Sequence, residues 1–191
     1  GGEATLPCDA QNPLGGEQGA AATYAPQKGA DAAMVEQLEH GLFHLAAKLE
    51  QLGRPVLNLP GGGAAGGVGA GGSAFLHGSL RSGIEYLLEL YQFDHLLKTA
   101  DLVFTGEGRL DGQTAAGKVV SGIARHAARL RVPVIAITGD AVDPLDPLYA
   151  LGLTAASPIN RIAAPYEILR SRSREDLRHT MEGVLRLLSL S

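Results

Sequence analysis

The chain is poor in several features that mark particular classes of protein. Its single cysteine, Cys8, cannot form a disulfide within the 191 residues, which excludes a disulfide framework and suits a reducing cytoplasm. No apolar run approaches the ~18 residues that span a bilayer, and no signal-peptide pattern appears, so we expect no contact with a membrane. The net charge of -4 and the lack of a basic block in the first 120 residues argue against a nucleic-acid binder.

What the chain does contain is typical of a packed α/β protein. Apolar residues make up 45% and charged residues 19%, and the 26 glycines, concentrated at loop positions, indicate tight turns and close ligand approach. We expect a boundary near residue 80. Residues 1–80 would form part of a second α/β domain, and residues 81–191 a Rossmann-like domain with a mostly parallel sheet. Because the first residue is Gly rather than Met, we expect a fragment or a processed chain.

A strand–loop–helix–strand unit in the middle of the chain is the active-site candidate. Residues 102–105 and 134–137 are short apolar runs typical of buried strands, and a helical pattern starts near Lys118. Ligands of open α/β sheets bind beyond the carboxyl ends of the strands. The loop there carries two carboxylates and an arginine before that lysine: Glu107, Asp111 and Arg109.

The remaining periodicity predicts further elements. Apolar spacing predicts helices over residues 34–52 and 172–188, one helix or two short ones over 84–98, and strands at 55–59 and, more weakly, 151–156. The last helix would dock on the sheet through one apolar face, formed by Leu177, Met181, Val184, Leu185 and Leu188. Four strand ends, after Leu59, Phe104, Ile137 and Ala156, deliver Gly, Ser or Thr with a polar neighbour, which predicts a shared crevice.

Three motifs admit a structural as well as a functional interpretation. The glycine run at residues 60–72 twice satisfies G-x-G-x-x-G, and it either brings backbone N–H groups to an anion or lets a helix start pack closely. His40 and His44 have a metal-motif spacing, but a solvated helix face explains them better. Residues 112–118 have the spacing of a P-loop, yet Val119 stands where that loop needs Ser or Thr, so we expect a different phosphate-handling loop.

Residues 105–118 (TGEGRLDGQTAAGK) resemble the signature loop of the bacterial type-1 glycerate kinases. Three further stretches agree with that family: PCDAQNPL at 7–14 with GAA at 19–21, PQKGA at 26–30, and PGGGAAGGVGAG at 60–71. The resemblance runs in order along nearly the whole chain but covers about the C-terminal half of the family's length. An absent N-terminal half would leave a sheet edge unpaired, so we expect either a homodimer or pairing with a separate N-terminal chain.

The resemblance implies ATP-dependent, Mg²⁺-assisted phosphorylation of D-glycerate to 2-phosphoglycerate, in a cleft between two domains. In phosphoryl transfer, Glu107 or Asp111 would hold Mg²⁺ or act as the base, Arg109 would bind a carboxylate or phosphate, and Lys118 would attract an anion at a helix start. Further expected substrate or nucleotide contacts are Asp9, Lys28, Gly62, Gly63, Gly66, Gly67, Thr105, Gly106, Gln113 and Thr114.

The sequence also allows purely structural roles for these residues and two rival functions for the chain. Glu107 and Arg109 can form a surface ion pair, Asp111 and Thr114 can serve helix capping, and Lys118 can be solvated. The first rival is a non-catalytic half-kinase that binds nucleotide or glycerate. The second is a dinucleotide-binding oxidoreductase, which is weaker because no acidic residue ends a strand about 20 residues after the glycines.

Overall fold

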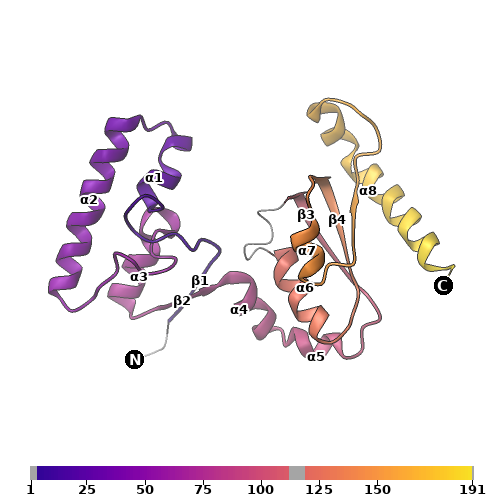
Figure 1. Cartoon of the computed structure of the whole chain (residues 1–191), viewed down its shortest axis with the longest axis horizontal. Helices are drawn as coiled ribbons and strands as arrows, with labels where there is room; N and C mark the ends of the chain where they lie inside the picture. Colours follow the sequence, from indigo (N-terminus) through magenta and orange to yellow (C-terminus); the bar gives the residue numbers. More distant parts are fainter. Residues whose placement is uncertain (1–3, 112–118, 191) are drawn as a thin grey trace. The chain divides into compact units, whose positions relative to one another are not determined.

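The computed structural model describes residues 4–111 and 119–190 (Figure 1). The chain divides into two compact units, Gly1–Tyr86 and Leu87–Ser191, each with its own hydrophobic core. No helix in the described part of the chain combines the length and the apolar character needed to cross a membrane.

The first unit is built from short strands, short helices and one long helix. Its elements are β1 (Thr5–Cys8), α1 (Ala20–Tyr24), the 3-10 helix η1 (Pro26–Lys28), α2 (Ala32–Gln51), the 3-10 helix η2 (Ala64–Gly66), α3 (Val68–Leu76), β2 (Ser79–Ser82) and α4 (Gly83–Leu90), which runs across the unit boundary. β1 and β2 pair in parallel, with Thr5 opposite Ser79 and Cys8 opposite Ser82. The core joins residues of α2 and α3 to Leu14 and Val56.

The long helix α2 forms where the apolar periodicity predicts it. Asp31 caps its N-terminus by accepting a hydrogen bond from the N–H of Met34 at 2.8 Å, and the chain leaves the helix at Gly53, which has a positive φ. Ala46 and Leu49, in its second half, are buried in the core of the unit.

The strand expected at residues 55–59 is wrong, because the chain turns there. The N–H of Leu59 bonds to the carbonyl of Val56 at 3.2 Å, and the one lateral bond runs from the N–H of Leu14 to the carbonyl of Leu57 at 3.1 Å. An apolar run forms a strand only when a neighbouring strand satisfies its backbone groups. Val56 enters the core from a turn instead, and the strand beside β1 comes from Ser79–Ser82, which apolar patterning did not reveal.

The second unit is a three-stranded parallel sheet with helices on both faces. Its further elements are α5 (Phe93–Leu97), β3 (Val103–Leu110), α6 (Val119–Arg129), β4 (Val134–Ala141), α7 (Asp146–Ala150), β5 (Ala155–Pro158) and α8 (Tyr166–Leu188). The strand order is β3-β4-β5, and the five residues from Val134 to Thr138 of the central strand are all buried, as expected for a strand covered on both faces. The α/β fold class with parallel sheets is therefore confirmed.

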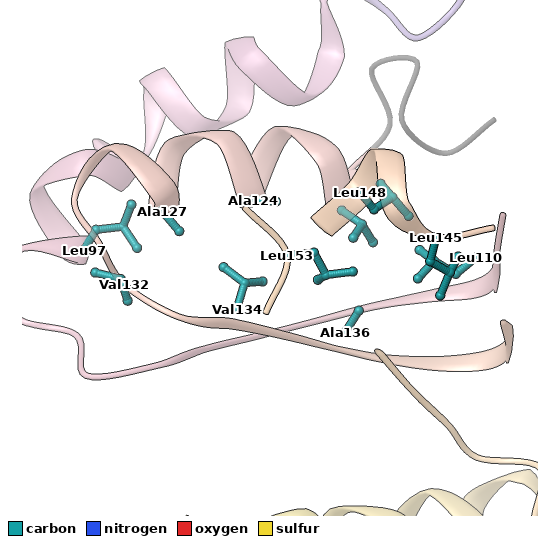
Figure 2. Close-up of a cluster of buried hydrophobic side chains, with 11 residues drawn as sticks. Leu97, Leu110, Ala124, Ala127, Val132, Val134, Ala136, Leu145, Leu148 and Leu153 are labelled. Carbon is teal, nitrogen blue, oxygen red and sulfur yellow. The ribbon is translucent and has the colours of Figure 1, made fainter. Parts of the chain in front are cut away.

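The main core lies between the sheet and α6 (Figure 2). Val120, Ala124 and Ala127 of α6 pack against Val134 and Ala136 of β4. Figure 2 also shows α8 on the opposite side of the sheet, where α8 contacts β4.

The face by which α8 docks differs from the expected one. Leu177, Leu185 and Leu188 are 42%, 51% and 39% exposed, whereas Asp176 and Thr180 are buried. The buried carboxylate is tolerated because Arg172, one turn earlier, donates to it from Nη2 at 3.0 Å and from Nε at 3.3 Å. The apolar stripe predicted from the sequence therefore remains largely on the outside of this helix.

Strand β3 continues past the point where the sequence predicted a loop. It runs through the Gly106–Gly108 region to Leu110, and its register with β4 places Glu107 opposite Thr138 and Arg109 opposite Asp140. A Cβ on Gly139 would overlap the carbonyl of Gly108, so the absence of a side chain at position 139 permits the close approach of the two strands. Glu107 and Arg109 therefore lie on a strand rather than in a loop.

Candidate active site

Polar side chains gather at the carboxyl edge of the three-stranded sheet. Glu107 and Arg109 lie on the last part of β3, Asp111 follows it, Asp140 lies near the end of β4, and Asn160 follows β5. Because the three strands are parallel, their carboxyl ends meet at one edge. The three predicted strand ends of this unit therefore adjoin one another, whereas Leu59 belongs to a turn in the other unit.

Glu107 is a partly buried carboxylate of this edge. Its register partner is Thr138, which is 1% exposed, and strand alternation places both on the same face as Ala136, which packs beneath α6. The Oε2 atom of Glu107 and the Oγ1 atom of Thr138 are both removed from solvent.

Arg109 and Asp111 form a looser pair at the outer end of the strand. Their Nε and Oδ2 atoms are 3.9 Å apart, and their side chains are 64% and 31% exposed. An ion pair this exposed contributes little to stability, so it does not by itself explain the two charges. Arg109 also lies opposite Asp140 in the sheet, which brings a second carboxylate to the same edge.

Asp140 and Asn160 are candidate site residues that the sequence-derived set does not include. The side-chain amide of Asn160 donates a hydrogen bond to Oδ1 of Asp140, and the N–H of Ile159 donates to the carbonyl of Thr138 at 2.8 Å. In the sequence, these two residues could have been found as polar residues near predicted strand ends. Only the sheet order shows that those ends adjoin the end of β3.

The spacing of the carboxylates limits how they can share a cation. Glu107 and Asp111 are four residues apart on a nearly extended chain, so their Cα atoms are roughly 13 Å apart at the usual rise of a strand. Within the described ranges no group of three or more His, Cys, Asp or Glu side chains is placed to hold a metal ion, and His40 and His44 belong to no such group. Two carboxylates completed by phosphate oxygens and water nevertheless suit Mg²⁺.

Of the other expected site residues of this unit, two lie on strand β3 and three lie outside the described residues. Thr105 and Gly106 lie on β3 opposite Ala136 and Ile137. The expected contacts Gln113, Thr114 and Lys118 fall in residues 112–118, outside the described part of the chain.

The glycines of the first unit are engaged in local packing. Each of the four N–H groups expected to meet a ligand donates to a main-chain carbonyl at 2.8–3.2 Å: Gly62 to Leu59, Gly63 to Asn12, Gly66 to Gly63, and Gly67 to Ala64. This arrangement supports the close-packing interpretation of the glycine run, and it leaves these N–H groups without capacity for an anion.

Asp9 and Lys28 occupy separate places in the first unit. Asp9 follows β1, and its Oδ1 atom would lie 2.7 Å from a Cβ on Gly83 at the start of α4. Lys28 ends η1 and, together with Gly66, lines a hollow beside α2.

The second unit is an α/β fold with charged side chains at the carboxyl edge of a parallel sheet, which is where such folds bind their ligands. The profile of the Glycerate kinase family matches residues 2–189. A Bacillus cereus protein named glycerate kinase is 40% identical over 178 residues, which cover 93% of this chain and 47% of the relative. An Escherichia coli K12 protein named glycerate 2-kinase is 41% identical over 149 residues, covering 78% of this chain and 39% of the relative.

A crystal structure of a proposed glycerate kinase 2 from Salmonella typhimurium LT2 superposes with a TM-score of 0.72 at 38% identity, and the match covers 98% of this chain and 49% of that one. This chain therefore belongs to the glycerate kinase family. It spans about half the length of the curated relatives it matches.

Proposed function

We propose that this chain supplies the C-terminal part of a glycerate kinase, which transfers the γ-phosphoryl group of ATP to D-glycerate. The observation that carries the proposal is the gathering of Glu107, Arg109, Asp111 and Asp140 at one edge of a parallel sheet in a member of this family. Phosphoryl transfer needs little else from a protein than positioned cations, carboxylates and a proton acceptor. The single cysteine, which can form no internal disulfide, agrees with a cytoplasmic enzyme.

The geometry favours a division of roles among the carboxylates. As a glycerate hydroxyl attacks the γ-phosphorus, its proton passes to a carboxylate and ADP leaves. Glu107 suits the proton acceptor, because its Oε2 atom is shielded from solvent, so that water competes little for the transferred proton. Asp111 and Asp140 would hold Mg²⁺, which neutralises phosphate charge, while Arg109 between them would bind the substrate carboxylate or a phosphate oxygen.

The proposed product is 2-phosphoglycerate. The support comes from the Escherichia coli relative, which is named a glycerate 2-kinase. Gln113, Thr114 and Lys118 complete the proposed phosphate contacts by resemblance to the family's signature segment. A dinucleotide-dependent oxidoreductase gains no support, because the N–H groups of the glycine run are already used within the protein.

A partner is part of the proposal. Since the chain spans about half the length of its relatives, either the N-terminal half of the family or a second copy of this chain would complete the site.

The test is a coupled ADP-release assay with ATP, Mg²⁺ and D-glycerate, run on this chain alone and after addition of the N-terminal half of a family member. We expect Asp111→Asn and Glu107→Gln each to lower kcat by at least about a hundredfold, as loss of a positioned acid–base group does. Asp101→Asn, just before the amino end of β3, is the matched control and should keep its activity.

The proposal fails if both substitutions leave turnover unchanged, or if neither preparation releases ADP. A chain that releases no ADP but is stabilised against heat by ATP or D-glycerate would instead be a binding half-kinase.

A further inference from the structure

A hollow of about 810 Å³ lies within the first unit, between α1, η1 and the first half of α2. Its volume is within the range of about 300–1,000 Å³ that is usual for small-molecule pockets. All its lining residues lie between Ala20 and Gly66, so the hollow belongs to the first unit, whereas the carboxylate cluster belongs to the second.

Most of the lining is apolar and uncovered. Met34 and Leu38, on α2, are 52% and 49% exposed, although they belong to the same apolar stripe as the buried Leu49. The second half of this stripe packs on the core and the first half faces the hollow. Exposed apolar surface that lines a concave site is typical of a ligand pocket.

The polar groups of the hollow favour an anionic ligand. Lys28 is the one charged side chain among the lining residues, and within the described ranges it has no ion-pair partner. Tyr24 also lines the hollow, and its ring is held in place because its hydroxyl donates to Oδ1 of Asn12 at 2.8 Å. A fixed aromatic ring and a single cation suit a ligand with a flat apolar part and a negative group.

Three glycines line the hollow, and two of them, Gly29 and Gly66, also have a positive φ that favours glycine. A Cβ added to Gly29, Gly41 or Gly66 would meet no atom within 4 Å. Gly41 lies inside α2, where glycine is the poorest helix former after proline. No packing among the described residues requires glycine at this position, so its role is explained by the space that it leaves to a ligand.

We propose that this hollow binds the adenine nucleotide of the phosphoryl-transfer reaction. The base would lie on the apolar surface of α2 beside Tyr24, and the phosphates would extend toward Lys28. D-Glycerate, a small and almost wholly polar anion, matches neither the volume nor the apolar lining. This inference rests on the proposed function, which makes ATP the phosphoryl donor.

The test is binding of the fluorescent nucleotide mant-ATP to the full 191-residue chain in the presence of Mg²⁺. Gly41→Leu would fill the hollow while improving helix propensity, and we expect it to raise the Kd at least about tenfold. Gly183→Leu is the matched control, because Gly183 is also inside a helix and has no atom near an added Cβ, and it should leave the Kd unchanged. Lys28→Gln should weaken ATP roughly fivefold while leaving competition by adenosine unchanged, since adenosine carries no phosphate.

An unchanged Kd in Gly41→Leu, displacement of mant-ATP by D-glycerate alone, or no binding of mant-ATP would each overturn the inference. A Gly41→Leu variant that loses a dimer but keeps its nucleotide affinity would also overturn the inference, because it would show that a second copy covers the hollow.

The binding measurement requires no phosphoryl transfer, so it separates this inference from the proposed function. Binding in the hollow without turnover would count against the proposed function alone, and turnover with normal nucleotide affinity in Gly41→Leu would count against this inference alone.

Discussion

Asp176 is a single residue whose environment could not be foreseen from its position in a charged helix. It is 1% exposed on the face of α8 that meets the sheet, and Arg172 neutralises it from a half-exposed position. The hydrogen bond and the charge of Asp176 raise the pKa of the Arg172 guanidinium above its ordinary value. Because this stabilisation is lost only when pH rises through the raised pKa, the pair stays intact at neutral and moderately alkaline pH.

We predict an unequal response to removing the two partners. Asp176→Asn removes the buried charge and one of the two acceptor oxygens that Arg172 contacts, and it should lower the free energy of unfolding by about 1–3 kcal/mol. Arg172→Leu leaves a buried carboxylate without compensation, so it should be the more destabilising change. Denaturant unfolding of both variants, at neutral and moderately alkaline pH, measures this.

The double variant R172L/D176L provides the control, because replacing a buried pair by apolar side chains is often neutral. It should be more stable than Arg172→Leu alone. Equal stability of the two single variants would contradict the account of Asp176 as a buried charge held by one partner.

Helix α3 shows how one element depends on where its glycines lie. A Cβ on Gly69 would overlap the carbonyl oxygen of Gly61, whereas a Cβ on Gly71, two residues later in the same helix, would meet no atom within 4 Å. Both residues belong to the same glycine run, but of the two the structure gives only Gly69 a packing role.

We predict opposite effects of alanine at these two positions. Gly69→Ala should lower the free energy of unfolding by about 1–3 kcal/mol, because α3 must move away from the turn at Gly61. Gly71→Ala should raise it by about 0.5–1 kcal/mol through helix propensity. Chemical denaturation measures both changes in the free energy of unfolding, provided that the m-values of the variants are equal. A stabilising effect of Gly69→Ala would show that the start of α3 is not closely packed.

At the level of the whole molecule, helix α8 carries an exposed apolar stripe. Leu177 and Leu185 lie on that stripe, although the helix is docked on the sheet by its other face. The chain also spans about half the length of its relatives. Together these observations suggest that the stripe is covered in the complete assembly, by the N-terminal half of the family or by a second copy.

We therefore predict that the chain associates through α8. Sedimentation velocity should detect a dimer or, after addition of the N-terminal half of a family member, a mixed complex. The double variant L177E/L185E should weaken association at least about tenfold, because it places charges in an apolar interface. Arg186→Glu on the same helix should not, and a monomer that binds no N-terminal half would refute the prediction.

The order of elements was largely determined by local sequence. Apolar spacing alone sufficed to predict α2, since helical periodicity acts within a few residues, and the structure adds the cap at Asp31 and the exit at Gly53. The same reasoning located α6 and the buried start of β4, and the resemblance in the signature segment indicated the family that the comparisons then showed. These features depend on neighbours close in the chain or on a preserved motif.

The tertiary structure alone decided which residues meet. Strand β3 extends to Leu110 because β4 offers it hydrogen-bond partners, and residues 55–59 form a turn because no strand lies beside them. Asp140 joins Arg109 at the sheet edge through strand order, and Asp176 is buried because Arg172 neutralises it. Pairing and burial depend on groups distant in the chain, so local patterns could name the charged residues of this protein but not the surroundings that give them a role.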